Sequence, residues 1–210
     1  MYDMKALYQA ASVEEAVALR LEHPEAQIIA GGSDVLVQMR EGKRAGAELI
    51  SIYGIDALRG VSMEPDGTLR IGSLTSFSHI TRDPLIQKYI NVLGEAVDQV
   101  GGPQIRNRGT IGGNILSASP AADTVPVLMA LDAVLVLVSE TGQRMVSING
   151  FMKGPGRTAI HQGEILTEIV IPFKTGAARF RKVGKRNALA ISIINVAVYM
   201  EKEAGRITTL

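Results

Sequence analysis

Two segments with paired glycines carry the most information in this chain: Ala30-Gly31-Gly32-Ser33-Asp34 and Thr110-Ile111-Gly112-Gly113-Asn114. Each pair follows an apolar or extended stretch and is followed at once by a small polar side chain. Glycine has no Cβ, so it adopts positive φ angles and lets the backbone approach a ligand closely. Successive glycines can also expose consecutive N–H groups as an anion-binding nest. Together the segments predict a clasp for two ends of one elongated, phosphate-bearing ligand.

Each segment has a simpler interpretation, which the residues alone leave open. The first can be an ordinary strand-to-helix turn, because it fits neither the G-x-G-x-x-G pattern nor the lysine-containing P-loop. The second lies in a polar, glycine-rich stretch over residues 101–123, predicted to be a long loop. A loop of that length is more often functional than a spacer, with a plain surface loop as the alternative.

Composition narrows the function classes. The chain has 210 residues, 46% of them hydrophobic, a net charge of +1 and no lysine-rich arm, which argues against nucleic acid as a partner. It has no apolar run of about 18 residues and no apolar signal-peptide core near Met1. We therefore expect a cytoplasmic protein without membrane insertion.

Cysteine is absent, which excludes thiolate catalysis, disulfides and iron–sulfur ligation by this chain. The histidines His23, His79 and His161 are far apart in sequence, so we expect no metal site. No serine–histidine–acid order or pair of carboxylates indicates a catalytic set, and we name no catalytic residue.

The first 56 residues predict a βαβ unit with a parallel sheet. Ser12 and Glu15 form a capping-box pattern that begins a helix ending near Glu22. Strands are expected at 27–30 and 47–52, with a short helix at 34–40 between them.

Residues 57–176 predict a second α+β unit with a mainly antiparallel sheet. Its expected elements are strands at 68–73, 133–138, 144–148 and 163–172, one helix over 83–100 and another over 123–131. Residues 177–210 are expected to begin a further small domain, with a strand at 178–182. The segment 191–200 fits a strand or a helix. Residues 207–210 resemble the start of a strand with no partner after it, as if the chain stopped inside a longer natural protein.

Two polar features near these elements have alternative interpretations. Asp123 is either a helix N-cap or an acceptor for a sugar hydroxyl. The basic run over residues 179–186 is either a solvated strand face or a source of one cation at the ligand.

The segments together resemble the FAD-binding (medium) subunit of the molybdenum hydroxylase family, that is, the flavoproteins of xanthine dehydrogenase and carbon monoxide dehydrogenase. The resemblance covers nearly the whole chain, and residues 102–107 are similar to bacterial xanthine dehydrogenase-like members. It rests on these residues: 29–34, 110–115, 118–120, Asp123, 163–166, Ile171-Pro172, Lys182 and Arg186.

The resemblance implies an α+β fold with two FAD-binding subdomains of the PCMH (vanillyl-alcohol oxidase-like) type, followed by the start of a smaller C-terminal α+β domain. By matching position, residues 27–34 would line the FAD pyrophosphate and ribityl chain, 110–114 would form the second cradle, and Asp123 would bind the adenosine side. Leu166 and Lys182 would contact the cofactor, and Val100 falls where some relatives carry an aromatic residue near FAD. The implied cofactor-binding residues are Gln27, Ile28, Ile29, Ala30, Gly31, Gly32, Ser33, Asp34, Val100, Thr110, Ile111, Gly112, Gly113, Asn114, Asp123, Leu166 and Lys182.

The family further implies a role in electron transfer. FAD would sit in this chain, while molybdopterin and [2Fe-2S] clusters would sit on a molybdopterin subunit and an iron–sulfur subunit. Electrons would pass from the clusters through FAD to NAD+ or another acceptor. The alternatives are a free-standing FAD-dependent oxidase or reductase of related fold, and an assembly subunit that has lost its cofactor.

Overall fold

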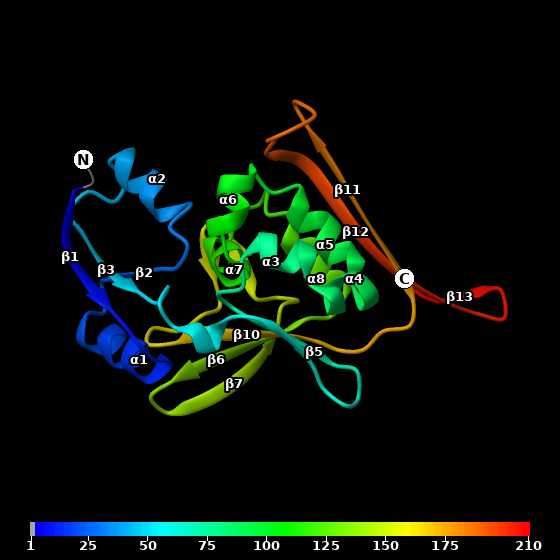
Figure 1. Cartoon of the computed structure of the whole chain (residues 1–210), viewed down its shortest axis with the longest axis horizontal. Helices are drawn as coiled ribbons and strands as arrows, with labels where there is room; N and C mark the ends of the chain where they lie inside the picture. Colours follow the sequence, from blue (N-terminus) through cyan, green and yellow to red (C-terminus); the bar gives the residue numbers. More distant parts are fainter. Residues whose placement is uncertain (1–2) are drawn as a thin grey trace.

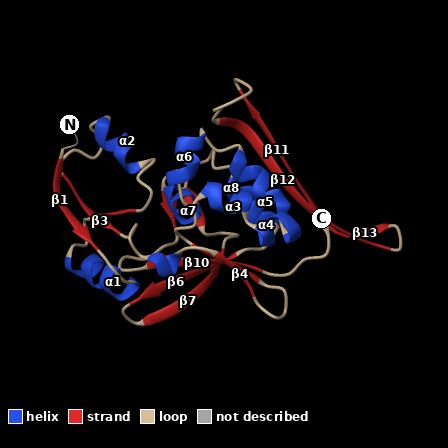
Figure 2. Cartoon of the chain, viewed as in Figure 1, coloured by secondary structure: helices blue, strands red, loops and turns tan. Residues whose placement is uncertain are grey.

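The computed structural model describes residues 3–210, which form an α+β fold as expected (Figures 1 and 2). The N-terminal part holds β1 (Met4–Gln9), α1 (Val13–Glu22), β2 (Gln27–Ile29), α2 (Val35–Arg40) and β3 (Ala47–Ser51). Its strands are ordered β1-β3-β2 and are all parallel, which confirms the predicted parallel sheet and adds β1, a strand that the sequence pattern did not indicate.

The capping box at the start of α1 is confirmed. Ser12 Oγ accepts a hydrogen bond from the Glu15 N–H at 3.1 Å. Glu15 Oε2 accepts one from the Ala11 N–H at 2.7 Å. Both bonds satisfy N–H groups that the helix itself leaves unpaired, so they fix where the chain enters α1.

A five-stranded antiparallel sheet forms the centre of the molecule. Its order is β4-β5-β10-β6-β7, and it comprises β4 (Val61–Met63), β5 (Leu69–Gly72), β10 (Ile165–Ile171), β6 (Val134–Ser139) and β7 (Gly142–Ser147). A short 3-10 turn, η1 (Asp56–Leu58), precedes it, and a small ribbon of β8 (Met152–Gly154) and β9 (Arg157–Thr158) follows β7. The middle strand β10 is buried at six of its seven positions, with the half-buried Glu168 at its centre.

Six helices lie between this sheet and a C-terminal β-ribbon (Figure 1). They are α3 (Phe77–Arg82), α4 (Pro84–Tyr89), α5 (Asn91–Asp98), α6 (Pro103–Arg108), α7 (Ile111–Ser117) and α8 (Thr124–Ala130). The largest apolar core joins the buried faces of α3, α4, α5, α7 and α8 to β5, β6 and β10, whereas α6 has no buried residue. This core includes the buried side chains of Ile80, Leu93, Ile115, Leu128 and Ile169. Burial of such side chains is the main source of fold stability.

Two expectations about the segment 83–123, one helix followed by one long loop, are wrong. The predicted single helix over 83–100 is broken at Ile90, whose φ of −140° and ψ of 47° are not helical. The break lets Ile86 and Leu93, one on each helix, enter the same core. The stretch predicted as one long loop, 101–123, instead contains α6 and α7.

The C-terminal ribbon is antiparallel, in the order β11-β12-β13: β11 (Ala177–Gly184), β12 (Ser192–Glu203) and β13 (Arg206–Thr209). The ambiguous segment 191–200 is therefore a strand. The strand expected at 207–210 is present as β13, and it pairs with the preceding strand β12 through Ile207 and Lys202. The domain boundaries after residues 56 and 176 stay predictions. Within residues 3–210, no helix combines the length and the apolar character that crossing a bilayer requires.

Candidate cofactor site

A cavity of about 550 Å³ lies between the loop after β2, the start of α7 and strand β10. It brings together both glycine pairs, which are about eighty positions apart in the sequence. Most of the residues expected at the site line this cavity: Gln27, Ile28, Ala30, Gly31, Gly32, Ser33, Asp34, Val100, Thr110, Gly112, Gly113, Asn114 and Leu166. Ile29, Ile111, Asp123 and Lys182 are not among its lining residues.

The first glycine pair forms an open row of donors. Gly32 has a φ of +78°, a conformation that favours glycine, and the chain then turns into α2. Among residues 3–210, none of the backbone N–H groups of 31–35 donates a hydrogen bond to the protein. Successive unpaired N–H groups at a turn attract anions, so this loop has the character of a phosphate-binding nest.

Gly31 has a different role from Gly32. A Cβ built on Gly31 would overlap the carbonyl oxygen of Arg108, the last residue of α6. The Arg108 guanidinium carbon in turn lies 4.0 Å from the ring centroid of Tyr53, which follows β3. The lack of a side chain at position 31 therefore lets α6 close against the nest.

The second glycine pair differs from the first, because both of its N–H groups have partners within the protein. A contact of residues 110–114 with a cofactor stays a prediction. Gly112 and Gly113 lie inside α7, and their N–H groups donate to Ser73 O at 2.9 Å and Thr110 Oγ1 at 3.2 Å. What requires glycine here is close packing, because a Cβ on Gly112 would lie 2.8 Å from Ser73 Cβ. The pair brings the start of α7 against the end of β5 and keeps the cavity wall thin.

Asn114 is held in place at the cavity wall. Its Oδ1 accepts a hydrogen bond from Thr124 Oγ1 at 2.5 Å, while in the described part of the chain its Nδ2 has no acceptor. This arrangement leaves the side-chain amide as a donor for a ligand.

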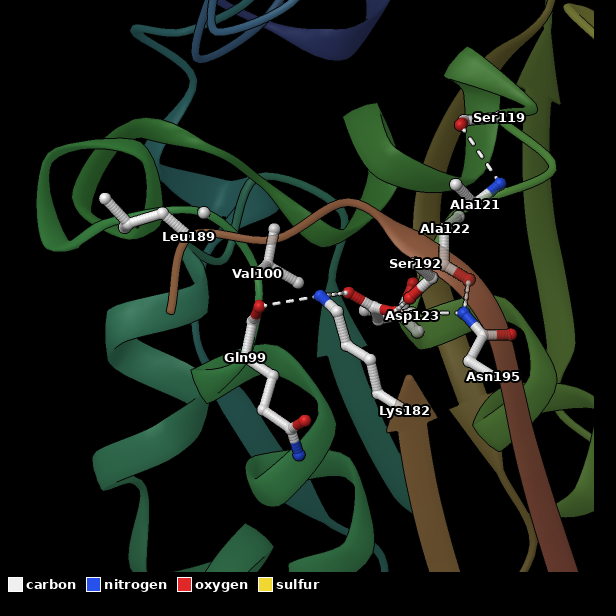
Figure 3. Close-up of polar contacts among 12 residues, drawn as sticks. Gln99, Val100, Ser119, Ala121, Ala122, Asp123, Lys182, Leu189, Ser192 and Asn195 are labelled. Atoms are coloured by element: carbon white, nitrogen blue, oxygen red, sulfur yellow. Dashed lines mark hydrogen bonds and ion pairs between the residues drawn. The ribbon is translucent and has the colours of Figure 1, made fainter. Parts of the chain in front are cut away.

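Asp123 and Lys182 form a buried ion pair near the cavity-lining Val100 (Figure 3). Lys182 Nζ donates to Asp123 Oδ2 at 2.6 Å, and the two side chains are 7% and 5% exposed. Asp123 Oδ1 accepts from Ser192 Oγ at 2.5 Å and from Asn195 Nδ2 at 2.9 Å. Lys182 also donates to Gln99 O at 2.9 Å, directly before the cavity-lining Val100.

These contacts bear on the alternative interpretations of Asp123 and of the basic run over residues 179–186. Asp123 occupies the N-cap position of α8, but its side chain makes no capping hydrogen bond. In the basic run over 179–186, the Lys182 side chain is buried, while Arg179, Arg181, Lys185 and Arg186 are exposed. The run is thus a solvated face with one inward cation. A contact of Asp123 or Lys182 with a cofactor stays a prediction.

Other residues that line the cavity were not predicted from the sequence. They include Arg20, Pro24, Glu25, Ala26, Ile160, His161 and Glu164. The Arg144 guanidinium donates to both carboxylate oxygens of the buried Glu164, and this bond holds the pKa of Glu164 below its usual value although burial raises it. Glu164 lies in the segment 163–166 that carried the resemblance, which was the one available signal.

Comparison with known proteins agrees with this geometry. Residues 2–174 match the family described as FAD binding domain in molybdopterin dehydrogenase. The putative xanthine dehydrogenase FAD-binding subunit of Escherichia coli K12 is 36% identical over 100% of this chain and 73% of that protein. The carbon monoxide dehydrogenase medium chain of Hydrogenophaga pseudoflava is 33% identical over 94% of this chain and 69% of that protein.

Solved structures of proteins from the same family also match this chain. A carbon monoxide dehydrogenase from Hydrogenophaga pseudoflava, in a form lacking the Mo-pyranopterin moiety, matches with a TM-score of 0.95 at 31% identity, over 100% of this chain and 73% of that chain. A glucooligosaccharide oxidase from Acremonium strictum matches with a TM-score of 0.51 at 16% identity, over 89% of this chain and 39% of that chain, which shows a shared fold alone.

The fold and the cavity define a flavoprotein of the PCMH-type architecture. Within that class, the chain belongs to the FAD-binding subunits of the molybdenum hydroxylase family. The residues present fit FAD: the unpaired N–H groups of 31–35 suit a diphosphate, and the glycines at 31 and 112 let Arg108 and Ser73 pack directly against the backbone of two cavity-lining segments.

Proposed function

We propose that this chain is the FAD-binding electron-transfer subunit of a xanthine dehydrogenase-like molybdenum hydroxylase. The observation that carries the proposal is the shared cavity, which is lined both by residues 31–35, whose N–H groups have no protein acceptor, and by the start of α7. FAD, when bound, supplies the redox chemistry, and the protein supplies binding, orientation and electrostatics.

In this proposal, the N–H groups of 31–35 hold the diphosphate and the Asn114 amide donates a further hydrogen bond. Val100 and Leu166 provide apolar contact at the cavity wall. The buried Lys182–Asp123 pair is bonded through Lys182 to the carbonyl of Gln99, the residue directly before Val100. Lys182 is therefore the cation best placed to move toward the cofactor near Val100.

The proposed complex has two partner subunits. Since the chain contains no cysteine, it has no thiolates for an iron–sulfur cluster, and the [2Fe-2S] clusters are assigned to one partner. Molybdopterin is assigned to the other. Electrons enter from the clusters and leave to NAD+, and the complex works in the cytoplasm. The name of the Escherichia coli relative, a xanthine dehydrogenase subunit, supports this choice of complex.

Reconstitution tests the proposal against its alternatives. The chain assembled with its two partner subunits is expected to reduce NAD+ with xanthine, while the isolated chain oxidises no small substrate. Turnover of a small substrate by the isolated, FAD-loaded chain would instead support a free-standing oxidase or reductase. A chain that assembles with both partners but takes up no FAD would support the assembly role.

A further inference from the structure

One buried hydroxyl in the molecule has no partner. Among residues 3–210, Ser73 Oγ is the single buried side-chain nitrogen or oxygen without a hydrogen bond. Ser73 is 3% exposed and directly follows β5. Buried polar groups in folded proteins are nearly always hydrogen-bonded, so an exception requires an explanation.

Hydroxyl groups of residues near Ser73 do have hydrogen-bond acceptors. Thr75 Oγ1 donates to Gly60 O at 3.1 Å, and Thr167 Oγ1 donates to Val136 O at 3.2 Å. The Ser73 backbone is equally well tied: its N–H donates to Thr167 O and its carbonyl accepts from Gly112 N, both at 2.9 Å. The missing bond is therefore specific to the Ser73 hydroxyl.

Ser73 lines the cavity, while its Oγ is buried beneath the cavity surface in the rotamer that the structure shows. It lies against Gly112 in α7, where a Cβ would come within 2.8 Å of Ser73 Cβ. The serine is thus on the wall of the cavity that also contains the nest at 31–35. Rotation about its single χ1 bond, among three staggered wells, redirects the hydroxyl without moving the backbone.

We propose that Ser73 is a cofactor-binding residue whose hydroxyl donates a hydrogen bond to a phosphate oxygen of the FAD diphosphate. The proposal rests on the proposed FAD-binding function and deepens it. A hydrogen bond to an ionised oxygen is stronger than one between neutral groups, so the bound diphosphate supplies the acceptor that the protein lacks. The hydroxyl is then satisfied in the cofactor complex.

A purely structural serine and a cofactor-binding serine predict different results for Ser73→Ala. Removing an unpaired buried hydroxyl takes away no protein hydrogen bond, so the FAD-free chain is expected to keep or raise its melting temperature. The same change removes one bond to the cofactor, and the dissociation constant for FAD is expected to rise about tenfold.

The experiment titrates the purified full chain with FAD and with ADP, following flavin fluorescence and its displacement, and records the melting temperature without ligand. ADP carries the diphosphate but no flavin or ribityl chain. The expected result is a loss of affinity of about tenfold for both ligands in Ser73→Ala, with no loss of melting temperature. The matched control is Thr167→Val, which removes a paired hydroxyl outside the cavity; it should lower the melting temperature and change FAD affinity less than about twofold.

Three outcomes overturn the proposal. Equal FAD affinity in Ser73→Ala and the wild type would show that Ser73 makes no hydrogen bond to FAD, while the proposed function would still stand. Weaker binding of FAD but not of ADP would show that the hydroxyl of Ser73 does not bind the diphosphate. A wild-type chain that binds neither ligand contradicts the proposed function itself, and the inference falls with it.

Discussion

Gly31 and Arg108 are in backbone contact: a Cβ on Gly31 would overlap the Arg108 carbonyl oxygen. Because one partner is a backbone atom at the end of α6, no change of rotamer relieves the overlap. The Tyr53 ring lies against the Arg108 guanidinium at 4.0 Å and near that of Arg59 at 4.5 Å. The contacts thus join the segments after β2 and β3 to the end of α6, beside the cavity-lining Gly31.

The first prediction concerns that contact. Gly31→Ala should push α6 away from the nest and raise the dissociation constant for FAD by at least about tenfold. Gly54→Ala is the matched control, since a Cβ there would meet nothing within 4 Å. The measurement is FAD titration of variants whose circular dichroism matches the wild type. Equal affinities in both variants would show that the contact does not shape the site.

The second prediction separates backbone strain from cofactor contact. Gly32 and Gly42 have nearly equal φ angles, +78° and +76°, so the backbone strain of a valine is similar at either position. At Gly32 the added Cβ also lies 3.1 Å from the flexible end of the Leu36 side chain, Cδ1. Gly32→Val is expected to abolish retention of FAD, because it distorts the row of N–H groups at 31–35. Gly42→Val is expected to retain it, since nothing lies within 4 Å of its Cβ. Equal flavin content in the two purified variants would contradict this.

The third prediction concerns the Lys182–Asp123 pair. Lys182→Met leaves a buried carboxylate without its cation and should cost about 3–5 kcal/mol in free energy of unfolding. Adding Asp123→Asn removes the uncompensated charge and keeps an acceptor for Ser192 and Asn195, so the double variant should recover more than about 1 kcal/mol. Urea denaturation at neutral pH measures both values. Additive losses would show that the two charges are not energetically coupled.

The fourth prediction concerns pH. The hydrogen bond from Arg144 lowers the pKa of Glu164 in the folded chain. The resulting stability is present above the pKa of an unfolded glutamate, about 4.3, and is lost as the pH falls through the lower folded value. Glu164→Gln should therefore be less stable at neutral pH and lose less stability than the wild type on acidification below about pH 4.3. Parallel stability curves would contradict this account.

Local signals predicted much of the fold. Ser12 and Glu15 are close in sequence, and so are Asp83 and the N–H groups it caps at the start of α4, so their chemistry is readable without tertiary structure. The parallel N-terminal sheet could be predicted from the order of its elements. The break at Ile90 could not be predicted, because it depends on which side chains pack into the core, and the helical periodicity of the sequence continues across it.

The site was predictable where a motif is continuous and not where it depends on packing. The glycine pairs were recognised from sequence, but the different roles of Gly32 and Gly112 depend on whether tertiary partners take up their N–H groups. Ser73 and Arg20 gave no signal, since nothing in their local sequence places them on the cavity wall. The partner of the strand near residue 207 is the preceding strand β12, which the ambiguous pattern of 191–200 concealed.

The central claim is that the cavity between the two glycine pairs holds FAD. The most direct test is the visible absorption spectrum of the purified chain after incubation with FAD and removal of the excess, with the released cofactor identified after denaturation. We predict flavin bands and one FAD released per chain. A folded, colourless chain that takes up no added FAD would contradict the claim.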